Sequence, residues 1–367
     1  IPEAWKDDTE AYDNEEPNRY QSAIKHGFPS PYYGFDHVDI VTGHGDKASG
    51  YYQQWFRKNH SNWQELIDPS NELDHTYTCP QAFRTPIPVE SYPTAYIKEQ
   101  AKEYLRQNAQ SATPLFSYVS FPDPHHPFNP PGKYWDMYSP DAFDVPVTYS
   151  DHQNPPPPLE FVRQEFQSGA ASNLATTTFM ADDRHIREAM ALTAGMITMI
   201  DDAVGEIIET LEQTGQIENT IVVFNADHGD YLGDFNLMLK GAWPKESITR
   251  VPMIWADPMG PRAKQVSELA STIDLSATIL ERAALTPYFG MQGRSLLKMM
   301  SGQEKVRDSL LIEFNDMMAR MGFEDPARVR TLLTKEWHLS IYKDQNWGEL
   351  YNRRSDPNHL ENLWDHD

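Results

Sequence analysis

The spacing of apolar positions along the chain predicts alternating helices and strands. Residues 184–213 have apolar side chains at intervals of three or four, which is typical of an amphipathic helix, and Gly215 follows as a stop signal. Residues 95–108 show the same pattern over a shorter stretch. Two compact apolar runs, 115–121 and 220–224, are rich in β-branched and aromatic residues and predict buried strands.

The order of these elements indicates the fold class. A further strand is expected at 251–255 and a further helix at 272–284. Alternating helices and strands are typical of an α/β domain built around a mostly parallel sheet. The last part of the chain instead has short apolar runs joined by charged turns, which predict a small antiparallel sheet. These runs are 310–314, 329–333, 337–342 and 349–351. We therefore expect two domains, 1–300 and 301–367.

Two segments lack any periodicity. Residues 1–30 are polar and rich in proline and acidic residues, which predicts an irregular arm. Residues 122–158 are rich in turn-forming residues and end in four consecutive prolines, which excludes a helix interior and predicts a long surface loop. A loop of that length in a compact enzyme is usually functional or disordered. We expect this loop and the aromatic segment 31–56 to line a substrate pocket.

Charge and composition narrow the classes of partner. The 367 residues include 31 Lys and Arg against 54 Asp and Glu, a net charge of −23, so we expect no nucleic-acid partner. No apolar run approaches the roughly 20 residues of a membrane span. The single cysteine, Cys79, excludes an internal disulfide and a thiolate metal cage. The N-terminal residues show no signal-peptide pattern, and the compartment is left open between periplasmic or secreted and cytoplasmic.

The strand predicted at 220–224 leads directly into Asp227-His228-Gly229. Ligands of α/β sheets bind at the carboxyl ends of strands, and a carboxylate beside an imidazole offers one oxygen and one nitrogen to a divalent cation. Gly229 would permit a sharp turn by which both side chains converge. The alternative is an Asx-turn in which Asp227 only caps backbone groups. Two ligands are too few for any metal, so others have to come from elsewhere.

Two further side chains suit an oxyanion. Lys240 lies in a segment with few other basic groups, and its ammonium could neutralise a sulfuryl or phosphoryl oxygen. The alternative is a solvated surface lysine. His125 lies in a proline-rich loop after the apolar run 115–121, where it could protonate a leaving-group oxygen or bind the anion. The alternative there is a histidine with a purely structural role.

Several motifs occur in a fixed order over most of the chain. They are the segments 120–128, 200–205, 227–234, 240–241, 250–255, 348–351, 356–357 and 361–363. Together they resemble the sulfatase family of the alkaline phosphatase superfamily. The resemblance implies an alkaline-phosphatase-like α/β fold and the hydrolysis of sulfate monoesters. In that mechanism a hydrated formylglycine attacks sulfur while a divalent cation and basic side chains hold the sulfate oxygens.

The resemblance also implies roles for single residues. Asp227 and His228 are expected to bind the metal. Lys240 is expected to contact the sulfate and the leaving group, and His125 to contact the sulfate or donate a proton. The implied metal is Ca²⁺, with Mn²⁺ and Zn²⁺ left open by the nitrogen ligand. His44 is a weaker candidate for the substrate pocket, with a role in a tight turn as the alternative.

The chain departs from the family pattern in one respect. Sulfatases carry a Cys/Ser-x-Pro-x-Arg nucleophile segment near their start, and none occurs in this sequence. The proline follows Cys79 directly and Arg84 is displaced, so Cys79 is excluded as the nucleophile. We therefore expect the formylglycine to lie outside this chain and only part of the active site to lie within it. Asp201 and Asp202 are interpreted as packing and capping residues, because they stand on a predicted helix.

Other functions fit the same residues. A phosphonate monoester or phosphodiester hydrolase of this fold would use the same metal and oxyanion contacts. A catalytically inactive relative that binds sulfated glycans would keep metal and ligand binding without turnover, and an extracellular structural module would need neither. The expected partner is a carbohydrate or other small-molecule sulfate ester, and homo-oligomerisation is left open.

Overall fold

The protein divides into two compact units. The computed structural model describes residues 13–21, 27, 29–170, 177–261 and 265–366. The first unit comprises Ile1–Asp144 and Arg187–Glu218, and the second comprises Val145–Ile186 and Asn219–Asp367. The predicted domain boundary at residue 300 stays a prediction.

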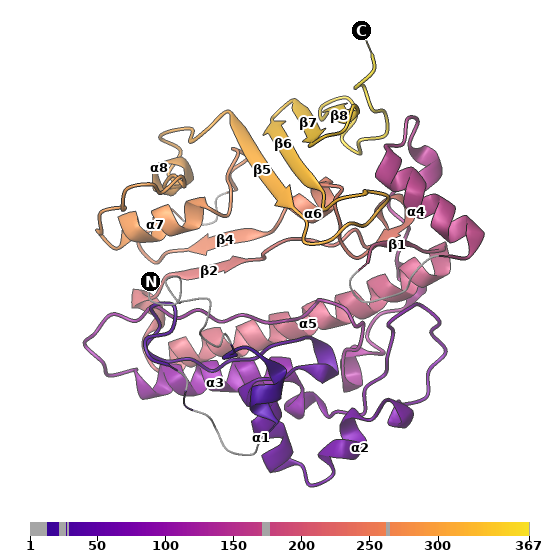
Figure 1. Cartoon of the computed structure of the whole chain (residues 1–367). Coiled ribbons are helices and arrows are strands. Elements are labelled where there is room, and N and C mark those ends of the chain that lie inside the picture. The colour runs from indigo at the N-terminus through magenta and orange to yellow at the C-terminus, as the bar shows by residue number, and fades with distance from the viewer. Residues whose placement is uncertain (1–12, 22–26, 28, 171–176, 262–264, 367) are drawn as a thin grey trace. The chain divides into compact units, whose positions relative to one another are not determined.

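The first unit is mainly helical. Its helices are α1 (Tyr51–Asn59), α2 (Trp63–Ile67), α3 (Pro93–Gln107) and most of α5 (Asp183–Gln213). The predictions for α3 and α5 are confirmed, whereas α1 and α2 were not predicted. Figure 1 shows α3 alongside α5, where Lys98 and Lys102 form ion pairs with Glu206 at 2.7 and 2.6 Å. An aromatic core that includes Tyr52 and Tyr92 fills the unit.

The strand predicted at 115–121 is wrong. In the described residues this segment is assigned to no strand, and the side chains of Phe116 and Tyr118 are 59% and 72% exposed. The ring of Phe116 stacks on Phe35 with 5.9 Å between centroids. An apolar run shows the propensity for a strand, but a strand also needs a hydrogen-bonded neighbour, and propensity does not supply one.

Among the residues that the structure describes, the second unit contains three small sheets. One pairs β1 (Phe179–Met180) with β3 (Leu237–Met238), and another pairs β2 (Val222–Asn225) with β4 (Met253–Ala256). The mixed α/β class is confirmed. The expectation of parallel pairing is not met by β2 and β4, which pair antiparallel. The chain between them runs through β3, short helical turns and loops rather than through a crossover helix.

The third sheet confirms the antiparallel sheet predicted for the end of the chain. Its strands follow one another in the order β5 (Ser309–Asn315), β6 (Arg328–Thr334), β7 (Trp337–Tyr342) and β8 (Gly348–Asn352), and every pair is antiparallel (Figure 1). Val329 and Tyr342 belong to a buried cluster that also includes Trp243 and Leu237. The sheet therefore shares a core with the loop that carries Lys240.

The remaining helices are short. They are α4 (Pro157–Ser168), α6 (Glu246–Thr249), α7 (Asp274–Arg282) and α8 (Leu297–Met300). Helix α7 confirms the helix predicted at 272–284, and α4 starts inside the predicted proline-rich loop. Pro157 and Pro158 occupy its first positions, where a missing N–H costs no helical hydrogen bond. Among the described residues no helix combines the length and apolarity that crossing a bilayer requires.

Single turns of 3₁₀ helix connect these elements. They are η2 (Pro17–Tyr20), η3 (Gly45–Lys47), η4 (Pro69–Asn71), η5 (Val89–Ser91), η6 (Gly132–Tyr134), η7 (Pro140–Ala142), η8 (Tyr149–Asp151), η9 (Ile217–Asn219) and η10 (Asp234–Asn236).

Candidate active site

Asp227 and His228 follow β2 in the second unit, and one side-chain atom of each, Asp227 Oδ2 and His228 Nε2, lies close to the other. Asp227 Oδ1 accepts a hydrogen bond from the backbone N–H of His228 at 2.8 Å. His228 Nδ1 lies 2.8 Å from the carbonyl oxygen of Gly229. Because a carbonyl only accepts, Nδ1 is the donor in this contact, and Nε2 is the ring atom that could bind a cation. Asp227 Oδ2 and His228 Nε2 are 3.4 Å apart.

This pair fits a divalent cation. Two atoms bound to one metal at typical bond lengths lie roughly 3–3.5 Å apart, and an imidazole that ligates a metal usually donates its other N–H to a backbone carbonyl or carboxylate. The side chains of Asp227 and His228 are 85% and 39% exposed, so both can be reached. In the part of the chain that the structure describes, no group of three or more His, Cys, Asp or Glu residues could hold a metal ion. The residues present therefore supply two ligands.

Gly229 is required here for a reason other than the predicted turn. Its backbone is not left-handed. A Cβ atom at this position would instead lie 1.8 Å from the carbonyl oxygen of Ser247. The N–H of Gly229 donates to the carbonyl oxygen of Ile248 at 2.8 Å, which draws the two backbones together. The glycine thus permits close backbone packing directly after the Asp227–His228 pair.

Lys240 returns to the neighbourhood of this pair. The N–H of Tyr231 donates to the carbonyl oxygen of Leu239 at 2.8 Å, so the loop closes on itself one residue before Lys240. Partial burial lowers the pKa of Lys240, while the charges of Asp230 and Asp227 act in the opposite direction. Burial likewise raises the pKa of Asp230, and Lys240 opposes it. Lys240 is therefore a half-buried cation within electrostatic reach of the carboxylates of Asp230 and Asp227.

Asp230 was missed by the sequence analysis as a site residue. The only available signal was its position two residues after His228, and that spacing alone does not show that the loop folds back onto Lys240. Four non-glycine residues of this loop, Leu232, Phe235, Asn236 and Leu239, have positive φ angles between 40° and 67°. Such residues persist only where the surrounding packing imposes their conformation. The loop that positions Lys240 is therefore held by its packing.

A buried ion pair anchors the end of this loop. Lys245 Nζ lies 3.3 Å from Glu349 Oε1. It also lies 3.9 Å from the ring centroid of Tyr351 and 4.1 Å from that of Trp243. Glu349 Oε1 also accepts hydrogen bonds from Trp243 Nε1 and Tyr351 Oη, each at 2.7 Å. Burial lowers the pKa of Lys245 to about 8 against the opposing effect of Glu349. Sequence analysis missed this pair.

In the first unit, the structure brings His125 and His44 together. Their rings stack with 3.6 Å between centroids and an interplanar angle of 13°. His125 Nδ1 lies 2.6 Å from the carbonyl oxygen of His126, so Nδ1 donates and Nε2 is the atom left for chemistry. His126 is buried and stacks on His125 at 4.0 Å.

Other candidates lie away from these groups. Cys79 is buried, and burial together with the charge of Glu188 raises the pKa of its thiol to about 12. This is the opposite of an activated thiolate, in agreement with its exclusion as a nucleophile. Asp202, on α5, accepts a hydrogen bond from Tyr134 Oη at 2.6 Å, which is a packing role.

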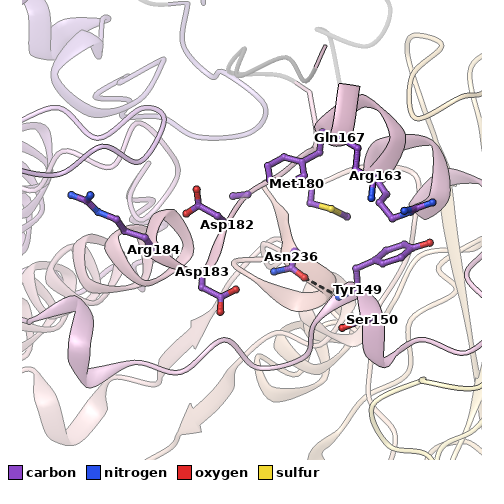
Figure 2. A pocket seen from close by; sticks show the side chains of 11 residues that line it. Tyr149, Ser150, Arg163, Gln167, Met180, Asp182, Asp183, Arg184 and Asn236 are labelled. Carbon is purple, nitrogen blue, oxygen red and sulfur yellow. Dashed lines mark hydrogen bonds between the residues drawn. The ribbon is translucent and has the colours of Figure 1, made fainter. Parts of the chain in front are cut away.

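An open groove of about 780 Å³ lies within the second unit. Figure 2 shows Tyr149 and Arg163 on one side of it, Asp182 and Asp183 on the other, and Met180 between them. The groove is also lined by Ser150, Phe166, Gln167, Ala181, Arg184 and Asn236. Its floor at Met180 belongs to β1, which pairs with β3, and Thr178 Oγ1 just before β1 donates to the carbonyl oxygen of Lys240 at 2.7 Å.

Comparisons with known proteins place the chain in a family. The sulfatase family model matches residues 20–285, and the model for the C-terminal part of N-sulphoglucosamine sulphohydrolase matches residues 233–367. An arylsulfatase from Clostridium perfringens (strain 13 / Type A) is 26% identical over 85% of this chain and 61% of its own length.

Solved structures support the fold. A phosphonate monoester hydrolase from Silicibacter pomeroyi is similar over 87% of this chain and 65% of its own, with a TM-score of 0.71 and 21% identity. A protein solved with its substrate D-glucosamine-2-N,6-O-disulfate is similar over 75% of this chain and 66% of its own, with a TM-score of 0.63 and 18% identity. These likenesses show the alkaline-phosphatase-like α/β fold that was predicted.

The chain spans between 50% and 61% of the length of three curated relatives that it matches. The sulfatase model covers well over half of the chain, and the residues it covers include the Asp227–His228 pair, Lys240 and the stacked histidines. The chain belongs to the sulfatase family.

Proposed function

We propose that this chain takes part in the metal-assisted hydrolysis of sulfate monoesters. The observation that carries the proposal is a half-buried Lys240 within electrostatic reach of Asp230 and Asp227, together with the Asp227–His228 pair, whose Oδ2 and Nε2 atoms are 3.4 Å apart. That arrangement offers positive charge and a cation site within one loop, which is what a tetrahedral oxyanion requires.

Each residue has a distinct proposed role. Asp227 Oδ2 and His228 Nε2 would hold the divalent cation, with Ca²⁺ proposed first and Mn²⁺ and Zn²⁺ as alternatives. When bound, the metal supplies charge neutralisation at the sulfate oxygens, and formylglycine supplies the nucleophile. Lys240 donates hydrogen bonds to a sulfuryl oxygen. His125 Nε2–H gives its proton to the leaving-group oxygen as the sulfur–oxygen bond breaks.

The nucleophile is proposed to lie outside the residues assigned here. Cys79 cannot serve, because a buried thiol with a raised pKa is neither accessible nor activated. The groove beside β1 is proposed to take the part of the ester that is not sulfate. Its aromatic, amide and carboxylate lining suits a polar ring such as a sugar, in line with the expected carbohydrate sulfate ester.

Two alternatives can be separated from this proposal by experiment. A phosphonate monoester hydrolase is similar in fold, and the same cation and lysine would serve a tetrahedral phosphorus. Comparing turnover of an aryl sulfate with that of a phenylphosphonate ester separates the two reactions. Metal and sulfated-glycan binding without turnover, in protein whose formylglycine has been verified by mass spectrometry, would instead support the inactive binding protein.

Substitution of Lys240 tests the proposal. The test uses protein in which mass spectrometry has verified the formylglycine. In that protein K240A should lower aryl sulfate turnover about 100-fold or more, as removal of an oxyanion contact does. The unfolding midpoint should stay unchanged. Lys298, which is exposed and pairs with Glu304 at 3.2 Å, provides the matched control. Equal turnover in K240A and K298A would show that Lys240 does not contact the sulfate ester.

Metal retention tests the cation site separately. D227A and H228A should each lose the bound divalent ion, measured by elemental analysis after gel filtration and by calorimetric titration with Ca²⁺, Mn²⁺ and Zn²⁺ in turn. Retention of the ion in both variants would contradict the assignment of Asp227 and His228, whatever happens to turnover.

A further inference from the structure

A buried hydrogen-bond chain joins the two loops that carry the stacked histidines. Asn129, four residues after His125, donates from Nδ2 to Asp46 Oδ1 at 2.8 Å, and Asp46 lies two residues after His44. Tyr92 Oη donates to Asn129 Oδ1, also at 2.8 Å. Asn129 and Tyr92 are completely buried and Asp46 is almost so. Water therefore cannot replace these bonds if one partner is lost.

The turn that carries His44 packs tightly against Asn129 at Gly45. Gly45 has a φ angle of +57°, and a Cβ atom built on it would lie 2.6 Å from Asn129 Oδ1 and 2.9 Å from Pro127 Cγ. The base of the turn is closed by the N–H of Ser49, which donates to the carbonyl oxygen of Thr42 at 2.7 Å. Glycine packing and hydrogen bonding thus fix the same short segment from two sides.

The stacked geometry needs such support. Two imidazoles 3.6 Å apart repel each other when both are protonated. His44 itself is exposed, so burial of its own side chain does not hold the two rings together. The other titratable groups on these elements are Asp46 and Lys47 in the turn, Asp123 and His126 in the loop, and Tyr92 before α3.

We propose that the Asp46–Asn129 hydrogen bond is a positioning element that holds the His44 imidazole against the His125 imidazole, so that the two rings act on the sulfate ester as one coupled unit. Asp46 and Asn129 act through the histidines and touch no substrate. The role in ester hydrolysis rests on the proposed function, whereas the coupling itself is a property of the first unit.

Coupled titration of the two rings tests the proposal without turnover, metal or substrate. The full 367-residue chain is labelled at histidine ¹³Cε1, and the resonances of His44 and His125 are assigned with H44Q and H125Q. Two unit charges at this separation interact strongly enough, even in water, to move a pKa by about 1 unit. H125Q should therefore raise the pKa of His44 by about 1 unit in the otherwise unchanged chain.

The same substitution in an N129L background should raise the pKa of His44 by less than about 0.3 units, because the turn is no longer held. D46N keeps an oxygen acceptor for Asn129 Nδ2, so H125Q should still raise the pKa of His44 by about 1 unit in the D46N background. Y52F removes another buried hydrogen bond of this unit, from Tyr52 Oη to the carbonyl oxygen of Ser91 at 3.0 Å, and should also retain this shift. N129S replaces N129L if circular dichroism shows that N129L does not fold.

Three results would overturn the proposal. The first is an equal shift with and without Asn129. The second is the absence of any shift in the unchanged chain, and the third is an equal loss of coupling in Y52F or D46N. If the coupling is found but K240A keeps full turnover, the proposed hydrolysis fails while the positioning role of Asn129 stands.

Discussion

Replacement of Lys245 by methionine should strongly destabilise the second unit. The Glu349 side chain is 1% exposed, and its carboxylate would remain with only neutral donors, the indole N–H of Trp243 and the hydroxyls of Tyr342 and Tyr351. Breaking a buried ion pair from one side costs about 3–5 kcal/mol. Methionine keeps most of the aliphatic volume of the lysine stem, so the loss measures charge rather than packing.

A double substitution isolates that charge. In K245M/E349Q neither member of the pair carries a charge, and the amide oxygen can still accept hydrogen bonds from Trp243 and Tyr351. We expect this variant to recover about half or more of the loss, because uncharged buried pairs are often as stable as ion pairs. Urea unfolding at pH 7, followed by circular dichroism and tryptophan fluorescence, gives the free energies. A loss below about 1 kcal/mol in K245M, or a double variant less stable than both single ones, would refute the reasoning.

Three further predictions concern single positions. G229A should destabilise the fold by several kcal/mol and displace the Asp227–His228 pair, because its Cβ would overlap Ser247; unchanged metal binding and an unchanged unfolding midpoint would contradict this. Burial alone would raise the pKa of Glu349, but Lys245 and two tyrosine hydroxyls outweigh it and lower the pKa to about 2. The pKa of Glu349 in the folded state lies below its value in the unfolded chain, so this stabilisation is complete above about pH 4.5. It is lost as the pH falls toward 2, by up to about 3 kcal/mol. If the free energy of unfolding of E349Q fell by the same amount between pH 4.5 and 2, the prediction would be wrong. Cys79 should react with iodoacetamide at pH 8 only in urea, checked by intact mass, since a rapid reaction of the native chain would contradict its burial.

The elements predicted correctly are those that local pattern determines. Helix α5 has a long apolar stripe and is followed by a glycine. The strands β5–β8 are separated by charged turns, and strands that are neighbours in sequence are also neighbours in the sheet. The segment 115–121 failed because its apolar residues meet the compositional rule for a strand without a neighbouring strand to pair with. Helix α4 was missed because its prolines were interpreted as loop residues, although they occupy the first turn.

The candidate site was predictable only in part for the same reason. Asp227 and His228 are adjacent in sequence, so their convergence could be expected from the motif. The contact between Asp46 and Asn129 joins residues 83 positions apart, and Lys245 meets Glu349 over 104 positions. No periodicity or spacing connects such residues, and a single sequence contains no signal for their pairing.

The exposed aromatic side chains of Phe116 and Tyr118 have a practical consequence for handling the chain. Contiguous exposed rings favour contact between molecules, and the opposing colloidal repulsion comes from the net charge of −23. Protonation of histidines reduces that charge, although burial lowers the pKa of His152, His338 and His359 well below the mildly acidic range, so no more than ten of the 13 histidines contribute. Mildly acidic or high-salt buffers should therefore turn a clear preparation cloudy, while neutral buffers of low ionic strength keep the particles apart.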